Sequence, residues 1–335
     1  MPSLLDRALV VVTGKGGVGK TTVSGALGVL AARAGIRTVV VEVGDHSRLA
    51  DLFRAPEPEP GAEVRLAEGL YATSIDPDRV LLEWVQQLGG RIPGRILASS
   101  GTFQYFAAAA PGAKELFAMV KVWELAQNRR WQRRAAGYEL VILDAPATGH
   151  ALGMLRSPMT FGAIARVGPV RTQADAVRAL LTDPLRSAFV AVAQATDMAV
   201  TETLELRDGL ADLLSRDLET VVANALLPRR FSAPEIGRIA ALNGAPAGAA
   251  RRERGAQAAL LRAAAHAAIS VHERASFQHG QVARLRRRGL DVIGVPFQFS
   301  PELDVAALEG IADQLGRRIT SPAGRADPRP RASRV

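Results

Sequence analysis

The sequence contains no cysteine and only five methionines among its 335 residues. Without cysteine the chain has no disulfide, no thiolate metal site and no cysteine nucleophile. So few methionines leave little of the soft, adaptable surface that suits a promiscuous hydrophobic groove. No apolar run is long enough for a signal-peptide core or a membrane span, so we expect a cytoplasmic protein.

Lysine is also scarce, because nearly all of the 42 lysine and arginine residues are arginines. The four lysines are Lys15, Lys20, Lys114 and Lys121. A compact ammonium fits where a bulkier, planar guanidinium does not. Lys15 and Lys20, close together near the N-terminus, therefore mark the first place to look for a site. Lys114 and Lys121 share one face of a predicted helix; we expect both to be solvated, and the alternative is a contact with a partner subunit.

Short β-branched runs alternate along the chain with helical patterns such as Thr21–Ala34 and Thr203–Ser215. Most of these runs are continuously apolar, which is typical of parallel strands that are buried on both faces. The alternation predicts an α/β fold with an open, doubly wound, mostly parallel sheet. The predicted strands are Ala8–Val12, Thr38–Val43, Leu70–Ile75, Leu140–Asp144, Phe189–Ala193, Thr220–Ala223 and Val292–Val295.

Three segments depart from the alternation. Residues 76–135 have a purely helical pattern, which predicts a helical insertion that divides the main domain into residues 1–75 and 136–319. Residues 254–288 form one long alanine- and arginine-rich helical pattern. Residues 320–335 are rich in proline and arginine, and we expect a disordered tail there.

The first predicted strand leads into TGKGGVGKTT, which satisfies G-x-x-x-x-G-K-[ST] in the required strand–loop–helix setting. Glycines let the backbone N–H groups surround a phosphate, and the helix N-terminus adds positive charge. We expect Lys20 to reach the β- and γ-phosphates and the Thr21 hydroxyl to bind Mg²⁺. The sequence therefore predicts a P-loop NTPase that uses a nucleoside triphosphate and Mg²⁺. The predicted nucleotide contacts in this loop are Gly14, Lys15, Gly16, Gly17, Val18, Gly19, Lys20, Thr21 and Thr22.

The loop carries an additional lysine, Lys15. This variant resembles the deviant P-loop of the family that holds arsenite-pump ATPases, tail-anchored-protein-targeting ATPases, MinD, ParA and nitrogenase iron protein. The resemblance implies that Lys15 reaches across a nucleotide-sandwich dimer and stabilises charge on the partner's phosphates, so that hydrolysis requires a dimer. A cation that completes a transition-state site acts as an arginine finger does.

A second motif begins at Asp144, at the end of a predicted strand, where P-loop ATPases place the Asp that holds Mg²⁺. The segment Asp144–His150, DAPATGH, resembles switch II of the arsenite-pump and targeting ATPases, and the resemblance extends through Arg156-Ser157-Pro158. It does not resemble the shorter equivalents of ParA and MinD. The sequence therefore predicts Thr21 and Asp144 as the Mg²⁺-binding pair.

Switch I departs from the family pattern D-P-A-H-[SN]-L-x-D-x-F, whose first Asp positions the attacking water. The chain keeps the closing LADLF, Leu49–Phe53, but without a gap Gly44 falls on that Asp and Asp45 on the following Pro. A shift of one residue makes Asp45 the water-positioning group, and Glu42 is a more distant substitute. The alternative is a subunit that hydrolyses ATP slowly.

Two further segments resemble the family's adenine contacts. Val221–Pro228, VVANALLP, includes Asn224, whose amide both donates and accepts hydrogen bonds as an adenine edge requires. A cap at the strand end is the alternative role for Asn224. Ile293–Phe297 resembles the loop on the other side of the base, which assigns adenine contacts to Pro296 and Phe297.

Arginines are concentrated in residues 229–288, where twelve stand against three glutamates. The net charge of +9 therefore belongs to this one stretch. Such a stretch attracts nucleic acid, anionic lipid or an acidic partner. We expect a solvated helical face, without nucleic acid and with a membrane reached only through a partner.

The missing cysteines limit what the resemblance implies. Arsenite pumps of this family bind their metalloid through thiolates, and the targeting ATPases join their dimers through a zinc-binding C-x-x-C. We therefore expect an ATP hydrolase that forms a homodimer, or a heterodimer with a related ATPase subunit, and handles a hydrophobic protein or membrane-associated client. Two alternatives stay open: a nucleotide-regulated chaperone or targeting subunit with weak hydrolysis in a heterodimer, and a ParA- or MinD-like positioning ATPase that binds DNA through the arginine-rich stretch.

The assignment of Asp45 leads to a direct test. Asp45→Asn removes the carboxylate that positions water but leaves the phosphate loop intact, so ATP binding is expected to persist while turnover is lost. The measurement is phosphate release beside nucleotide titration. Unchanged turnover would remove Asp45 from the catalytic set.

Overall fold

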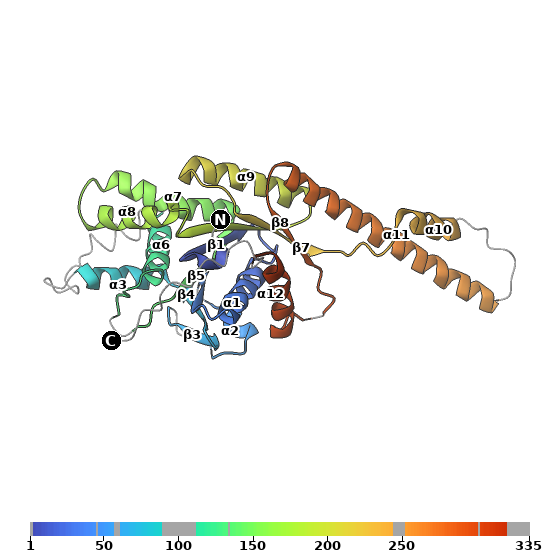
Figure 1. Ribbon diagram of the computed structural model, residues 1–335, viewed down its shortest axis with the longest axis horizontal. Coiled ribbons are helices and arrows are strands. Elements are labelled where there is room, and N and C mark those ends of the chain that lie inside the picture. The colour runs from blue at the N-terminus through green and yellow to red at the C-terminus, as the bar shows by residue number, and fades with distance from the viewer. Residues whose placement is uncertain are drawn as a thin grey trace.

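The computed structural model describes residues 3–44, 46–56, 61–88, 112–132, 135–243, 252–300 and 302–319. An eight-stranded sheet, ordered β3-β4-β2-β5-β1-β6-β7-β8, forms its centre (Figure 1). All neighbouring strands are parallel except β3 and β4. The strands are β1 (Leu9–Gly14), β2 (Thr38–Val43), β3 (Val64–Ala67), β4 (Leu70–Ile75), β5 (Leu140–Ala147), β6 (Ser187–Gln194), β7 (Thr220–Leu226) and β8 (Val292–Pro296).

The predicted α/β fold with a mostly parallel sheet is confirmed, and each of the seven predicted strands is present. The sequence prediction missed β3, which has four residues and lies at the edge of the sheet. Its side chains alternate between half-buried and exposed positions, so it lacks the continuous apolar run that identified the other strands.

Helices cover both faces of the sheet. One face carries α1 and α12, and the other carries α6, α7, α8 and α9 (Figure 1). The helices are η1 (Leu4–Asp6), α1 (Lys20–Arg33), α2 (Arg48–Leu52), α3 (Pro77–Leu88), α6 (Ala113–Leu125), α7 (Thr148–Ile164), α8 (Pro169–Thr182), α9 (Asp197–Leu214), α10 (Ala233–Asn243), α11 (Arg252–Arg287) and α12 (Val305–Ile319).

The central strand β1 explains why the strands read as unbroken apolar runs. Leu9 and Val11 belong to the hydrophobic cluster on the α9 side, whereas Val10 and Val12 belong to the cluster on the α1 side. Successive side chains of a strand point to opposite faces. Because both faces are covered, every position of β1 must be apolar.

Helices α3 and α6 occupy the described part of the predicted helical insertion 76–135. Buried charges lie at the end of α6: Arg130 Nε donates to Glu124 at 2.7 Å, and Arg130 Nη2 donates to Glu63 at 2.5 Å.

Lys121 of α6 is only 7% exposed and pairs with Glu83 of α3 at 2.8 Å. The prediction of a solvated Lys121 is therefore wrong, because α3 packs on α6 and brings Glu83 beside Lys121. Lys114 is exposed, as predicted, and pairs with Asp78 of α3.

Helices α10 and α11 form an antiparallel hairpin that projects from the body of the molecule (Figure 1). The long helix predicted over 254–288 is confirmed by α11, whose last turns pack on α9 and β7. None of the helices in the described ranges combines the length and the apolar character needed to cross a membrane. The predicted tail 320–335 lies outside the described residues.

The buried ion pair Arg130–Glu124 generates a prediction for stability. Both side chains are at most 3% exposed, so removing the guanidinium leaves a buried carboxylate with poorer compensation. Arg130→Ala is expected to lower the free energy of unfolding by about 3 kcal/mol. The matched control is Arg129→Ala, since Arg129 is exposed and its loss is expected to cost less than about 0.5 kcal/mol. Urea unfolding of the two variants measures the difference, and equal stabilities would contradict the prediction.

Candidate nucleotide site

The glycine-rich loop between β1 and α1 is shaped by close backbone approaches. Gly14 has φ +146°, and a Cβ atom there would lie 2.1 Å from the carbonyl oxygen of Val192 on β6. Gly19, the N-cap of α1, has φ +93°, and a Cβ atom there would lie 2.3 Å from the Asn224 side chain. Both positions favour glycine because their φ angles strain other residues, and at Gly14 a Cβ atom would also clash with backbone.

Lys20, the first residue of α1, turns back over the loop. Its ammonium donates to the carbonyl oxygens of Gly14 at 3.2 Å and Lys15 at 3.1 Å. Burial lowers the pKa of Lys20, as does the positive charge of Arg48, whereas Asp144 opposes the shift. The ammonium thus lies beside the loop that is predicted to surround a phosphate.

Thr21 and Asp144 meet at the end of the sheet. The Thr21 hydroxyl donates to Asp144 Oδ2 at 2.6 Å, and the Ser24 hydroxyl lies 3.4 Å from Oδ1. Burial raises the pKa of Asp144 to about 6; the neighbouring charge of Glu42 acts in the same direction, and the hydrogen bond from Thr21 opposes it. The predicted Mg²⁺-binding pair is therefore brought into direct contact.

The chemistry of this donor set fits Mg²⁺, which prefers hard oxygen ligands and usually takes only one or two carboxylates from a protein. Thr21 and Asp144 would hold the ion, with Ser24 beside the same carboxylate. A buried carboxylate whose pKa is raised gains from a neighbouring divalent cation, because the ion replaces the water lost on folding.

Switch I begins with Glu42, which pairs with Asp144 in the register of β2 and β5. Glu42 is buried and accepts hydrogen bonds from the Ser47 hydroxyl at 2.5 Å and from the backbone N–H groups of Arg48 and Leu49. Its carboxylate therefore anchors the start of α2. Asp45, the predicted water-positioning residue, lies outside the described residues.

Lys15, the additional lysine of the loop, points toward α9. Its ammonium pairs with Glu202 at 2.5 Å, and about a third of each side chain is exposed. Thr196 caps this helix, and Glu202 lies just after its first turn. Within a single chain Lys15 is thus held by a carboxylate rather than turned into the cavity.

The predicted adenine contacts lie on the far side of the loop. Asn224 Nδ2 donates to the carbonyl oxygen of Val18 at 2.9 Å, and its Oδ1 accepts from the N–H of Ala225. Pro296 ends β8, the next strand, and the Phe297 N–H donates to Leu226. Phe297 is 44% exposed and packs edge-on against Phe299. Asn224 therefore contacts the loop directly, whereas Pro296 and Phe297 lie one strand further out.

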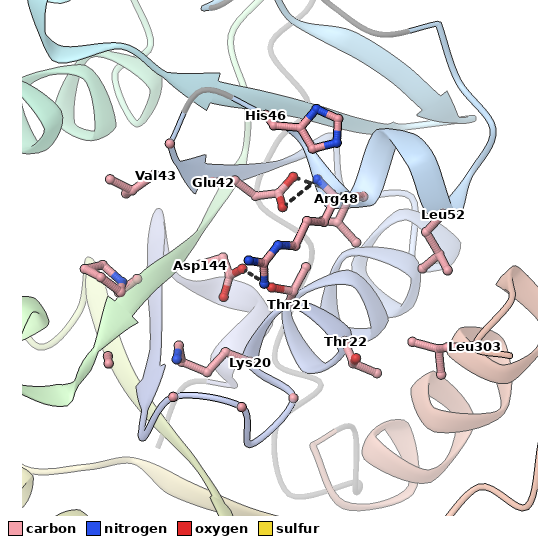
Figure 2. Close-up of a pocket in the computed structure, with 18 residues that line it drawn as sticks. Lys20, Thr21, Thr22, Glu42, Val43, His46, Arg48, Leu52, Asp144 and Leu303 are labelled. Atoms are coloured by element: carbon pink, nitrogen blue, oxygen red, sulfur yellow. Dashed lines mark hydrogen bonds between the residues drawn. The ribbon is translucent and has the colours of Figure 1, made fainter. Parts of the chain in front are cut away.

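A cavity of about 860 Å³ connects the loop with switch I and the end of β5 (Figure 2). Among the predicted site residues, Gly16, Gly17, Gly19, Lys20, Thr21, Thr22 and Asp144 line it. Gly14, Lys15, Val18, Asn224, Pro296 and Phe297 do not.

Sequence reasoning missed three residues of this site. Arg48 lines the cavity, Ser24 contacts Asp144, and Glu202 holds Lys15. In a chain so rich in arginine, Arg48 carries no sequence signal of its own. Glu202 is separated from Lys15 by more than half the chain, so only the fold brings them together.

The sequence of the chain is similar to one protein family and to several named ATPases. Residues 7–171 match the family described as anion-transporting ATPase. The chain is 29% identical over 248 residues to ATPase BagA of Mycobacterium tuberculosis, an alignment that covers 71% of each protein. It is 30% identical over 182 residues to ATPase GET3 of Paracoccidioides lutzii, covering 52% of this chain and 50% of the relative. A Halobacterium salinarum protein provisionally named an arsenical pump-driving ATPase is 29% identical over 229 residues, which are 65% of this chain and 35% of that protein.

The raised pKa of Asp144 generates a prediction for the protein free of metal and nucleotide. The pKa is about 6 in the folded chain and 3.8 without the fold, so between these values the folded chain binds more protons. Its stability therefore falls as pH rises through this window, by on the order of 2 kcal/mol. Asp144→Asn removes the carboxylate, so the variant is expected to gain stability over the wild type between pH 4 and pH 7.

Denaturant unfolding of both proteins at pH 4, 5 and 7 measures this difference. Glu42, whose pKa is also raised by burial, is present in both proteins, so the difference between them reports Asp144. A difference that does not change with pH would contradict the assignment.

Proposed function

The chain is an ArsA-like member of the anion-transporting ATPase family, and from this premise we propose that it is a Mg²⁺-dependent ATP hydrolase that works as a dimer. The observation that carries the proposal is the contact of Thr21 with Asp144 at the mouth of the glycine-rich loop. In this position Mg²⁺ would neutralise charge on the phosphates.

Different groups of the chain have different roles in the proposed hydrolysis. Backbone N–H groups of the loop and the Lys20 ammonium bind the phosphates, and burial keeps that ammonium in a site of reduced dielectric. A water oxygen bonds to the terminal phosphorus, the bond from that phosphorus to the bridging oxygen breaks, ADP leaves with that oxygen, and the water's proton passes to phosphate or solvent. Asp45 is the residue proposed to position this water.

The proposed dimer follows from Lys15. In the single chain its ammonium is neutralised by Glu202, so a role on the phosphates of a partner subunit requires this ion pair to break. Both side chains are about a third exposed, which makes the exchange inexpensive. The partner is a second copy of the chain or a related ATPase subunit, and the departure in switch I favours the related subunit.

A second candidate, a nucleotide-regulated chaperone or targeting subunit, draws on exposed apolar side chains around the helical region. Leu82 on α3 is 47% exposed, Ile164 at the end of α7 is 65% exposed, and Val167 before α8 is 84% exposed. Helices α3, α7 and α8 lie at one end of the molecule (Figure 1). Such residues suit an apolar client. Co-purification of apolar membrane-protein segments that is lost on Val167→Asp would favour this candidate.

Substitution of each of the two lysines of the loop tests the hydrolase proposal. Lys20→Ala is expected to weaken ATP binding at least tenfold, because a phosphate contact is lost. Lys15→Ala is expected to leave ATP binding intact and to abolish both turnover and ATP-dependent dimerisation. Nucleotide titration, phosphate release and sedimentation measure the three properties.

Lys114→Ala is the matched control for nucleotide binding, since Lys114 is exposed, pairs with Asp78 and does not line the cavity. Full turnover in Lys15→Ala would refute the dimer mechanism. Undiminished ATP binding in Lys20→Ala would refute the nucleotide site itself.

A further inference from the structure

Arg48, the first residue of α2, is the feature of the cavity that the proposed mechanism leaves unused. Figure 2 shows its side chain extending from the start of α2 across the cavity, in the direction of Asp144 and Thr21. The same cavity is lined by Lys20 and the glycines of the loop. Arg48 therefore faces the place where the phosphates of a nucleotide would lie.

The backbone of Arg48 is fixed by hydrogen bonds, whereas its guanidinium makes none to the described residues. Its N–H donates to Glu42 Oε1 at 3.0 Å, and Ser47 caps α2 through the N–H of Ala50. These contacts tie the start of α2 to the end of β2. The guanidinium is thus presented from an anchored backbone, which limits the entropy lost when it binds a ligand.

The guanidinium of Arg48 is unpaired within the part of the chain that the structure describes. Throughout the ranges that the structure describes, its guanidinium forms neither an ion pair nor a hydrogen bond, in contrast to Arg130, Arg207 and Arg216. Lys20 is a second cation that lines the same cavity. Two cations that repel each other in one cavity are relieved by an anion placed between them.

A phosphate group matches this arrangement better than an adenine ring. The planar guanidinium donates to two oxygens of a phosphate at once. Thr21 and Asp144 would hold Mg²⁺ at this end of the cavity, where the ion would neutralise charge on the outer phosphates of ATP. Asn224, the predicted adenine contact, lies outside the cavity lining, behind Val18 and Gly19.

We propose that Arg48 binds the terminal phosphate of ATP from within its own chain and thereby distinguishes ATP from ADP. This inference rests on the proposed function, since it names a further phosphate-binding residue of the same site. Arg48 adds a cation beside Lys20 that does not depend on the partner subunit. Because Glu42 anchors α2 through the N–H of Arg48, a phosphate bound by Arg48 also stabilises switch I in this conformation.

The test compares a non-hydrolysable ATP analogue with ADP, both with Mg²⁺, by calorimetric titration of the 335-residue chain. Arg48→Gln is expected to weaken binding of the analogue by about 10- to 100-fold, as for the loss of a charged hydrogen bond, and to change ADP binding less than twofold. Arg48→Lys keeps the charge without the fork and is expected to restore part of the difference. Arg54→Gln is the matched control, because Arg54 follows α2, is exposed and does not line the cavity.

The outcomes separate this inference from the function on which it rests. An equal loss of analogue and ADP binding in Arg48→Gln overturns it, and so does an unchanged ratio of the two affinities. Tighter analogue binding in the variant also overturns it, because Arg48 would then obstruct the cavity. If the wild-type chain binds neither nucleotide, the proposed function fails instead.

Discussion

The hydrogen bond between the Thr21 hydroxyl and the Asp144 carboxylate joins the two halves of the candidate site. Thr21 lies in the first turn of α1, whereas Asp144 lies on β5 beside Val12 of β1. The carboxylate can be held there only because parallel apolar strands bring β5 next to β1 and the loop folds back over their ends. Burial raises its pKa, so the site contains a carboxylate that is poorly solvated without a cation. The same constraint therefore accounts for the apolar strands, the glycines of the loop and the affinity expected for Mg²⁺.

The charges that surround this carboxylate are arranged in two layers. Glu42 and Asp144 lie at the ends of adjacent strands, and Lys20 and Arg48 approach them from the loop and from α2. A polyphosphate with Mg²⁺ would suit both layers, because Glu42 and Asp144 would offset the charge of the ion while Lys20 and Arg48 would bind the phosphate oxygens. A neutral ligand would leave both layers uncompensated, and a purely cationic ligand would leave the two cations uncompensated.

The sequence was most informative where both faces of an element are buried or where a motif is local. Leu9–Val12 could be recognised as a strand because every residue faces a core, and the loop from Gly14 to Thr22 could be recognised from its glycine spacing. Strand β3 could not be predicted from the sequence, because only alternate residues of this strand are partly buried. Lys121 was misjudged because its partner Glu83 lies on another helix, 38 residues away. Charge pairs of this kind depend on the packing of helices, which a single sequence does not reveal.

The projecting hairpin of α10 and α11 is connected to the same loop by two sets of polar contacts. Gln278 of α11 accepts from the N–H of Leu227 and donates to the carbonyl of Ala225, next to Asn224, which in turn contacts Val18 of the loop. Arg284 of α11 pairs with Asp197 and contacts Thr201 on α9, the helix whose Glu202 holds Lys15. A shift of the loop that breaks the Lys15 pair or moves Val18 therefore acts on contacts at the base of the hairpin. Since α11 is a continuous helix of 36 residues, a small rotation at its base becomes a larger displacement at its far end. The base of the hairpin is thus linked to the nucleotide site through polar contacts, although none of its described residues lines the cavity.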